Sequence, residues 1–223
     1  MLKKGTEVRT KKGISYIVSN GKIISYTPWL GDLFSFLYDS IMKKSVFPKK
    51  FEASLDTHNQ FLINEFKELR NKNILELATG SGNLSDFLSN DIKYSGIDIS
   101  NGLLKIAHKR FRRKNFNDLR LYLCSADNIP FEDNSFDICI CNLSLNFFND
   151  VKTVINEIKR VLKNNGTFIC SVPVPERNKK KSTIRGKLFT EKELKGIFEN
   201  MGFEFHSNNL INGTLLYFKA IKK

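Results

Sequence analysis

A glycine-containing turn between a short apolar run and a polar helix start limits the folds open to this chain more than any other feature. The segment reads ILELATGSGNL over residues 74–84. Gly80 and Gly82 allow a ligand to approach the backbone, and the helix start behind them offers unpaired N–H groups. The apolar run ends near an acid, Glu76, and the next one ends in Asp98. This arrangement is typical of an open α/β sheet that binds its ligand at the carboxyl ends of the strands.

Short apolar runs alternate with helical patterns from about residue 73 onward. Hydrophobicity within each run is continuous, so we expect strands buried on both faces, as in a parallel sheet. The predicted strands are residues 73–77, 94–98, 119–124, 136–141 and 166–172. The predicted helices between them are residues 83–89, 101–114 and 151–162. The pattern therefore predicts a doubly wound α/β domain with right-handed crossovers.

The C-terminal segment changes to an antiparallel pattern. Residues 190–201 begin with a capping-box spacing and precede Gly202, which predicts a helix. Two strand-like runs, 203–211 and 214–221, then flank Asn212-Gly213, a strong hairpin signal. The expected fold is a Rossmann-like, doubly wound, mostly parallel seven-stranded sheet that ends in an antiparallel hairpin.

The first 70 residues are harder to interpret. Asn20-Gly21 stands between two strand-like runs and predicts a second hairpin. Helical patterns follow at residues 28–42, which are rich in aromatics, and at residues 54–69, which are amphipathic. We predict that residues 1–70 form a hairpin and a helical cover, and that residues 71–223 form the α/β domain.

Positive charge is concentrated in two segments. The net charge is +13, which raises nucleic acid, an anionic membrane surface and an acidic substrate as partners. Residues 105–120 carry seven basic side chains and one acid, and residues 177–187 carry six basic side chains and no acid. The basic end of the helix at 101–114 should lie away from the ligand edge of the sheet. Only residues 177–187 are therefore expected to meet an anionic acceptor, a phospholipid surface or RNA.

Several classes of protein have little support. No apolar run approaches the ~20 residues of a membrane span, and the first residues lack the apolar core of a secretory signal. The four Cys lie in strand-like runs without a CxxC pattern, so we expect buried reduced thiols in a cytoplasmic protein. The three His are widely separated and give a metal site little basis.

A nicotinamide-binding enzyme is the first alternative to weigh. Gly80, Gly82 and Ser85 nearly match the GxGxxG fingerprint of dinucleotide-binding domains. However, Glu76 beside the turn would repel a pyrophosphate and suits a ligand that bears an ammonium group. The third glycine of the fingerprint, needed for close packing of helix on strand, is Ser85.

Four motifs in order resemble those of class I S-adenosylmethionine-dependent methyltransferases. They are ILELATGSG, GIDIS (96–100), SADNIPFEDNSFDICIC (125–141) and EIKRVLKNNGTF (157–168). The chain is most similar to the small-molecule, type 11 branch, which includes the ubiquinone/menaquinone C-methyltransferases, over about residues 73–221. One departure is Ala78, where many members have the first glycine of the turn; alanine is also familiar there.

The resemblance implies S-adenosyl-L-methionine as cofactor and S-adenosyl-L-homocysteine as product. The residues implied to hold the methionine part are Glu76 and the backbone of Ala78, Thr79, Gly80 and Gly82. Asp98 would accept hydrogen bonds from the ribose hydroxyls. The alternative is a purely structural role, in which Asp98 only caps a helix or loop.

The same resemblance assigns residues around the adenine and the methyl group. Ile99 would lie against the adenine, with Asp127 accepting from its amino group and Asn128 beside it. Asn142 and Leu143 would face the methyl group and the acceptor, although Asn142 could simply end a strand. Tyr38 stands where related enzymes often place an aromatic side chain near the cofactor.

The expected reaction is methyl transfer to a small, apolar or aromatic acceptor. Such a transfer depends on alignment and exclusion of water more than on charged residues. If the acceptor must lose a proton, His58 in the covering segment is the best candidate base, although a position on the helix surface is the stronger expectation. Two alternatives stay open: an RNA methyltransferase that uses the basic loop 177–187, and a non-catalytic cofactor-binding module. Neither the acceptor atom nor the oligomeric state follows from the sequence.

Overall fold

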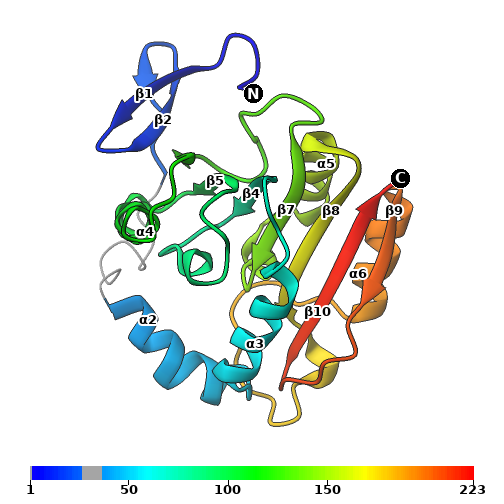
Figure 1. The fold of residues 1–223 in the computed structure, drawn as a ribbon. Coiled ribbons are helices and arrows are strands. Elements are labelled where there is room, and N and C mark those ends of the chain that lie inside the picture. The colour runs from blue at the N-terminus through cyan, green and yellow to red at the C-terminus, as the bar shows by residue number, and fades with distance from the viewer. Residues whose placement is uncertain (1, 27–36) are drawn as a thin grey trace.

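The computed structural model describes residues 2–26 and 37–223. Within them, one sheet has the strand order β1-β2-β6-β5-β4-β7-β8-β10-β9, with β3 beside β2 (Figure 1). The strands are β1 (Glu7–Lys11), β2 (Ile14–Ser19), β3 (Lys22–Ile23), β4 (Asn73–Leu77), β5 (Lys93–Asp98), β6 (Leu119–Leu123), β7 (Phe136–Asn142), β8 (Leu162–Pro173), β9 (Phe203–Ser207) and β10 (Leu215–Lys222). The helices are α2 (Tyr38–Ile41), η2 (Met42–Lys50), α3 (Leu55–Phe66), η3 (Asn83–Asp86), α4 (Asn101–Arg113), η4 (Leu145–Phe147), α5 (Val151–Val161), η5 (Pro175–Arg177) and α6 (Glu191–Asn200).

The strand pairing confirms the predicted fold class. β6, β5, β4, β7 and β8 are parallel neighbours, and β10 pairs antiparallel with both β8 and β9. The sheet has ten strands among the described residues, against seven predicted. The additional strands come from the N-terminus, because β2 pairs in parallel with β6 and brings β1 and β3 into the same sheet.

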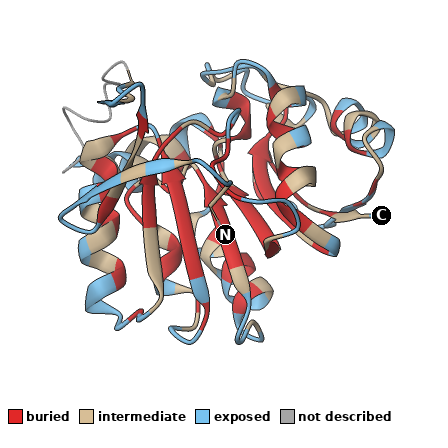
Figure 2. Cartoon of the chain, turned by 90° about the horizontal axis from the view of Figure 1, so that it is seen from above, coloured by how far each residue is buried: buried red, intermediate tan, exposed pale blue. Residues whose placement is uncertain are grey.

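Alternate residues of the central strands pack on opposite faces of the sheet. Ile74 of β4 joins a core with α3 and α4, whereas Leu75 and Leu77 join a core with α5 and α6. Buried residues therefore run through the middle of the molecule, between two helical layers (Figure 2). This confirms the prediction of strands buried on both faces, and it leaves the strand ends as the place for a site.

Several predicted elements differ in extent. The helix expected at residues 83–89 is the short 3₁₀ turn η3. The helix expected at 151–162 ends at Val161, because Leu162 already belongs to β8. The aromatic helix expected at 28–42 falls partly on residues 27–36, outside the described residues; the remainder is α2 and the start of η2.

Both Asn-Gly sequences lie at turns between antiparallel strands, as predicted. Asn20 and Gly21 have φ values of 50° and 72° and join β2 to β3, so the N-terminal hairpin is confirmed. At the C-terminus, β9 and β10 form the predicted antiparallel pair, with Ser207 opposite Phe218. Asn212-Gly213 lies at the turn between them, where the N–H of Leu215 donates to the Asn212 carbonyl at 3.1 Å. The same two residues also contact residues 38–66, which we call the cover.

Asn212 fastens the C-terminal loop to the start of α3. Its Oδ1 accepts from the N–H of Ser54 at 2.7 Å and its Nδ2 donates to the Ser54 carbonyl at 2.9 Å. Gly213 lies so close to the backbone that an added Cβ would be 2.2 Å from the carbonyl oxygen of Phe51. A glycine is required there by this close approach, and the contact fixes the cover onto the sheet.

The expectation about the cysteines can be checked on the described residues. Cys124, Cys139, Cys141 and Cys170 are free and buried, as predicted. Within residues 2–26 and 37–223, every helix is too short or too polar to cross a bilayer, and no cluster of His, Cys, Asp and Glu there has the composition of a metal site.

Candidate functional site

The glycine-containing turn and the end of β5 line a cavity of about 300 Å³, which we call the Asp98 cavity. It collects most of the residues predicted to bind the adenosine part of a cofactor. The predicted residues in its wall are Tyr38, Ala78, Gly80, Asp98, Ile99 and Asp127. Phe147 and Phe148, which follow β7, close it from another side.

The glycines of the turn have different tasks. An added Cβ at Gly80 would meet nothing nearer than 3.9 Å, so its backbone is open to the cavity. At Gly82 it would lie 2.8 Å from the Cα of Ala107, so Gly82 allows the turn to pack on α4. Ala78 has φ 51°, a region that costs a non-glycine residue free energy and that is enriched at functional sites.

The Asp98 carboxylate is fixed at the edge of the sheet. Its Oδ2 accepts from the N–H of Gly80 at 2.8 Å, and its Oδ1 accepts from the N–H of Ser100 at 2.7 Å. The side chain is 8% exposed. Because each carboxylate oxygen can accept more than one hydrogen bond, Asp98 both orders the turn and can receive hydroxyl donors from a ligand.

Glu76 lies beneath the turn and does not line the Asp98 cavity. Its Oε2 accepts from the Thr79 hydroxyl at 2.6 Å and from the Tyr94 hydroxyl. Burial raises the pKa of Glu76 to about 8, against the two hydrogen bonds that lower it. Glu76 is therefore largely protonated at pH 7 in the ligand-free protein, and a cation bound nearby would lower its pKa.

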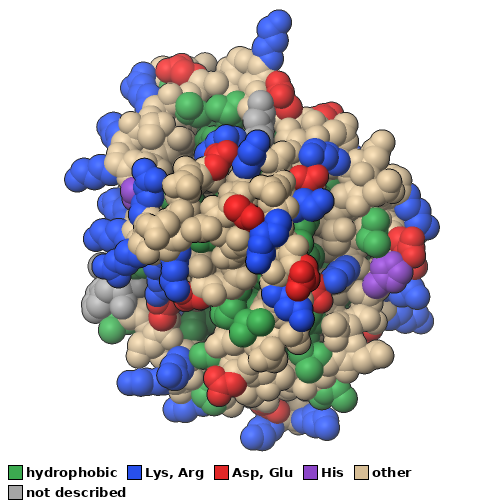
Figure 3. Space-filling model, viewed as in Figure 1, with side chains coloured by type: hydrophobic (Ala, Val, Ile, Leu, Met, Phe, Trp, Pro, Cys, Tyr) green, Lys and Arg blue, Asp and Glu red, His purple; other side chains and the backbone are tan. Residues whose placement is uncertain are grey.

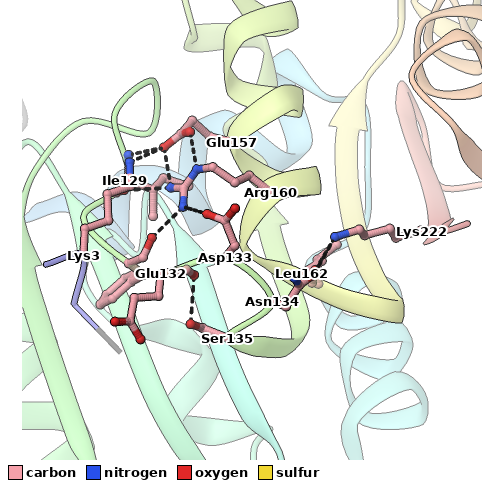
Figure 4. Close-up of polar contacts among 11 residues, drawn as sticks. Lys3, Ile129, Glu132, Asp133, Asn134, Ser135, Glu157, Arg160, Leu162 and Lys222 are labelled. Atoms are coloured by element: carbon pink, nitrogen blue, oxygen red, sulfur yellow. Dashed lines mark hydrogen bonds and ion pairs between the residues drawn. The ribbon is translucent and has the colours of Figure 1, made fainter.

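Asp127 and Asn128 are exposed in a loop that α5 fixes from below. Arg160 of α5 donates to the carbonyls of Ile129 and Phe131 at 2.9 and 2.6 Å. Glu157 accepts from the N–H of Ile129 at 2.7 Å and pairs with Arg160 (Figure 4). This network holds in place a connection that has no helix of its own, and so it positions Asp127 at the cavity.

A second cavity, of about 460 Å³, lies between the cover and the α/β domain; we call it the His58 cavity. The cover contributes the side chains Asp39, Met42, Lys43, Phe47, Leu55, His58, Asn59 and Leu62. The α/β domain contributes Asn83, Ser85, Asp86, Phe87, Arg110, Arg113, Lys114, Asn142 and Leu143. The predicted acceptor-facing residues Asn142 and Leu143 are thus brought together with the predicted base.

The expectation that His58 lies on the helix surface is wrong. His58 is 3% exposed, because its helix packs against β10 and the ring lies between Phe47 and Tyr217. Its Nδ1 is 3.1 Å from the Tyr217 hydroxyl, which also accepts from Asn212. Burial lowers the pKa of His58 to about 4, against an opposing hydrogen bond with Asn142, so the imidazole is neutral at pH 7.

The basic end of the helix at 101–114, expected to lie away from the ligand edge of the sheet, borders the His58 cavity. Arg110 forms an ion pair with Asp39 and donates to Ser81 and Asn83 beside the glycine turn. Arg113 and Lys114 line the His58 cavity. Lys and Arg side chains gather over α4 on this face of the molecule (Figure 3). The helix end reaches the cavity because the cover folds back over it.

The two cavities share their boundary. Tyr38 lines the Asp98 cavity and Asp39 the His58 cavity; in the same way Leu143 lines the His58 cavity and Ser144 the Asp98 cavity. Burial raises the pKa of Tyr38 to about 12, and Asp98 and Glu76 add to the effect, so its hydroxyl stays protonated beside those acids. The Asp98 cavity and the His58 cavity are thus separated by two pairs of adjacent residues, Tyr38-Asp39 and Leu143-Ser144, at one edge of the sheet.

Four predicted residues lie outside both cavity walls: Glu76, Thr79, Gly82 and Asn128. Sequence reasoning missed Arg110, Ser85 and Asp39 as site residues. Asp39 follows Tyr38 directly, which was a usable signal, whereas nothing local marks Arg110 apart from its basic neighbours. Their association depends on a contact between residues 71 positions apart.

Residues 75–170 match a family model described as a methyltransferase domain. The demethylmenaquinone methyltransferase of Thermotoga maritima is 28% identical over 159 residues, 69% of this chain and 66% of that protein. The C-methyltransferase UbiE of Rickettsia bellii is 34% identical over 108 residues, 45% of this chain and 44% of that protein. The chain spans less than two thirds of the length of the curated relatives it matches first.

Solved structures share the fold at low sequence identity. The YcgJ protein of Bacillus subtilis superposes with a TM-score of 0.64 at 15% identity, over 76% of this chain and 99% of that chain. The structure titled [4+2]-cyclase SpnF superposes with a TM-score of 0.68 at 17% identity, over 86% of this chain and 93% of that chain. Since one of these neighbours is named a cyclase, the fold by itself does not fix the reaction.

Proposed function

We propose that this chain, whose residues 75–170 match a family model described as a methyltransferase domain, transfers a methyl group from S-adenosylmethionine to a small, apolar or aromatic acceptor. The observation that carries the proposal is the shared boundary of the two cavities. A cofactor in the Asp98 cavity and an acceptor in the His58 cavity would meet at Tyr38-Asp39 and Leu143-Ser144. Two ligands held edge to edge provide the alignment that displacement requires.

The residues of the Asp98 cavity fit S-adenosylmethionine. Gly80 leaves room for close approach of a ligand, and Asp98 would accept from the ribose hydroxyls. Ile99 would lie against the adenine, with Asp127 and Asn128 at its amino group. The backbone of Ala78 to Gly82 would hold the methionine part, with Thr79 and Glu76 supporting the turn from below. Asn142 and Leu143 would stand at the methyl group.

The bound cofactor would supply an activated methyl group on a sulfonium sulfur. Phe147 and Phe148 on one side and Tyr38 of the cover on the other line the approach and would limit the access of water when the ligands are bound, which favours displacement over hydrolysis. His58, as a neutral imidazole, would receive a proton from the acceptor where one must be lost. Its pKa of about 4 makes it a weak base in the ligand-free protein, and an anion bound beside it would raise that pKa.

Calorimetry with S-adenosylmethionine and NAD tests cofactor choice, and methyl-labelled cofactor with extract fractions tests the acceptor. We expect binding of S-adenosylmethionine alone, with label transferred to a small-molecule fraction that nuclease treatment leaves unchanged. Nuclease-sensitive labelling would instead support an RNA acceptor at the loop 177–187. Cofactor binding with no labelled product in any fraction would support a non-catalytic module.

The variant His58→Gln separates the role of His58 from that of the cofactor site. We expect its methyl transfer to fall while its affinity for S-adenosylmethionine is unchanged, because His58 lines only the His58 cavity. Gln60→Ala, which changes an exposed residue of the same helix, is the matched control. Equal activity of wild type and His58→Gln would remove His58 from the mechanism.

A further inference from the structure

The wall of the His58 cavity carries an excess of positive charge. Among the described residues, four cations and two acids line it. Arg110 pairs with Asp39, and Lys114 pairs with Asp86 at 2.8 Å. The charges of Lys43 and Arg113 have no counterpart among the described residues of the wall. Arg113 is close enough to Arg110 to lower its pKa, in addition to the larger effect of burial, so the positive potential extends inward from the helix end.

The two unbalanced cations stand on opposite walls. Arg113 ends α4, where the helix dipole favours a cation in any case. Lys43 comes from η2 of the cover, and no helix C-terminus explains it. Both side chains are exposed, whereas His58, Phe47 and Leu62 are buried. The cations therefore border the outer part of the cavity, and the apolar side chains form its inner part.

One polar atom of the inner part lacks a partner. Ser85 is 3% exposed and lines the cavity. Among the described residues its Oγ has no hydrogen-bond partner. A buried hydroxyl without a partner costs free energy, and a polar atom of a bound ligand would remove that cost. This observation is independent of the cations and also indicates a ligand with polar atoms.

We propose that the His58 cavity takes an acceptor that combines a compact apolar body with one anionic group, a carboxylate or a phosphate, which Arg113 and Lys43 bind from opposite sides. The apolar body lies against Phe47, Leu62 and Leu143, with His58 and Asn142 at the end that meets the cofactor. Guanidinium and ammonium groups both favour such anions. The inference rests on the proposed function and adds the charge of the acceptor to it.

Calorimetric titration with three matched probes tests the proposal: 2-naphthoate, 2-naphthyl phosphate and the neutral 2-naphthamide. Each is titrated with and without saturating S-adenosylhomocysteine. We expect at least one of the anions to bind about tenfold more tightly than the amide, in keeping with a charge-assisted hydrogen bond. Comparison of carboxylate with phosphate identifies which anion the site prefers.

Two charge-reversal variants and a control assign the effect to this cavity. Arg113→Glu and Lys43→Glu should each remove most of the preference for the anion. Lys109→Glu changes the net charge equally on an exposed residue of the same helix that does not line the cavity, and should retain it. Equal affinity for amide and anions, no binding of either anion at millimolar concentration, or an equal loss in Lys109→Glu would overturn the proposal.

The proposed function and the proposed charge of the acceptor can be contradicted independently. Absence of S-adenosylhomocysteine binding contradicts the proposed function, while the titrations without it still measure the preference of the cavity. Normal S-adenosylhomocysteine binding with no preference for anions contradicts only the acceptor charge.

Discussion

The Asp98 cavity and the His58 cavity meet at one edge of the sheet but are built in different ways. Within residues 2–26 and 37–223, the wall of the Asp98 cavity comes from Tyr38 and from a single stretch, residues 78–154. The wall of the His58 cavity needs three segments far apart in the chain, from the cover, the turn with α4, and the end of β7. The first follows from strand ends that a parallel sheet must bring together. The second exists only because the cover is fixed onto the sheet.

The buried ionisable groups beside the two cavities have pKa values shifted in opposite directions. Burial raises the pKa of Glu76, beneath the Asp98 cavity, to about 8, and lowers that of His58 to about 4. In both cases the low-polarity surroundings favour the neutral form. Burial therefore leaves both groups uncharged at pH 7. A bound cation would favour the ionised form of Glu76, and a bound anion would favour the protonated form of His58.

At a fixed pH, the largest effect is expected for a substitution that weakens the contact between the cover and the sheet. In Gly213→Ala the new Cβ would lie 2.2 Å from the Phe51 carbonyl oxygen at φ 58°, and we expect a loss of about 3–4 kcal/mol in the free energy of unfolding. Denaturant unfolding measures it. Gly21→Ala, at φ 72° with nothing within 4 Å, is the matched control and should lose about 1 kcal/mol. Equal losses would mean that the contact does not fix the cover.

The second prediction concerns pH and the opposite shifts of the two buried groups. The pKa of His58 is 6.5 unfolded and about 4 folded, so the unfolded state binds the extra proton and stability rises with pH between 4 and 6.5. The pKa of Glu76 is 4.5 unfolded and about 8 folded, so stability falls as pH rises from 4.5 to 8. The full effect is about 3 kcal/mol for His58 and about 5 kcal/mol for Glu76, and the two oppose each other between pH 4.5 and 6.5.

Single variants should show how each group contributes to the pH dependence of the free energy of unfolding. His58→Gln should lose stability steadily from pH 4.5 to 8, whereas Glu76→Gln should gain stability from pH 4 to 6.5 and then level off. The measurement is the free energy of unfolding by denaturant across this range. A wild type and His58→Gln with the same pH profile would contradict a buried neutral His58.

The third prediction tests whether cofactor binding belongs to one cavity only. Asp98→Ala removes a buried acceptor of hydrogen bonds, and we expect the affinity for S-adenosylmethionine to fall about 10- to 100-fold, as for loss of a hydrogen bond to a charged group. Asp86→Ala removes an acid from the wall of the other cavity and should change that affinity little. Calorimetry measures both. Similar losses would mean that the cofactor extends through the His58 cavity.

The smallest expected effect concerns the ion pair between Arg110 of α4 and Asp39 of the cover. Arg110 and Asp39 are 28% and 43% exposed, and a double-mutant cycle with Ala should give a coupling of about 1 kcal/mol. The same cycle on Lys114 and Asp86, each 52% exposed, should give less. Added salt should weaken both couplings. No coupling between Arg110 and Asp39 would leave the cover held by its apolar contacts and Asn212.

The α/β domain could be predicted from sequence because its signals are local. Continuous apolar runs, caps and turns are set by neighbours in the chain, and the capping box of Thr190 and Glu193 forms as expected. β1 was missed because Glu7–Lys11 is a polar strand, mostly exposed, without alternation to mark it. Asn212-Gly213 forms the predicted turn, but nothing local predicts its close contact with the backbone of Phe51.

His58 shows where a usable signal was present. It stands four residues before Leu62 and eight before Phe66, on the apolar stripe of the predicted helix, and that position predicts burial. A histidine is by type more often found at the surface, but the helical spacing correctly indicated that His58 is buried.

The sequence alone determined the α/β architecture, the turn at Gly80 and the acid at Asp98, since periodicity and strand order place them at one edge. The tertiary structure decided the His58 cavity, because its walls are far apart in the chain and meet only after the cover folds. It also decided which groups carry charge. The ionisation of Glu76 and His58 depends on water excluded by residues that no local pattern connects to them.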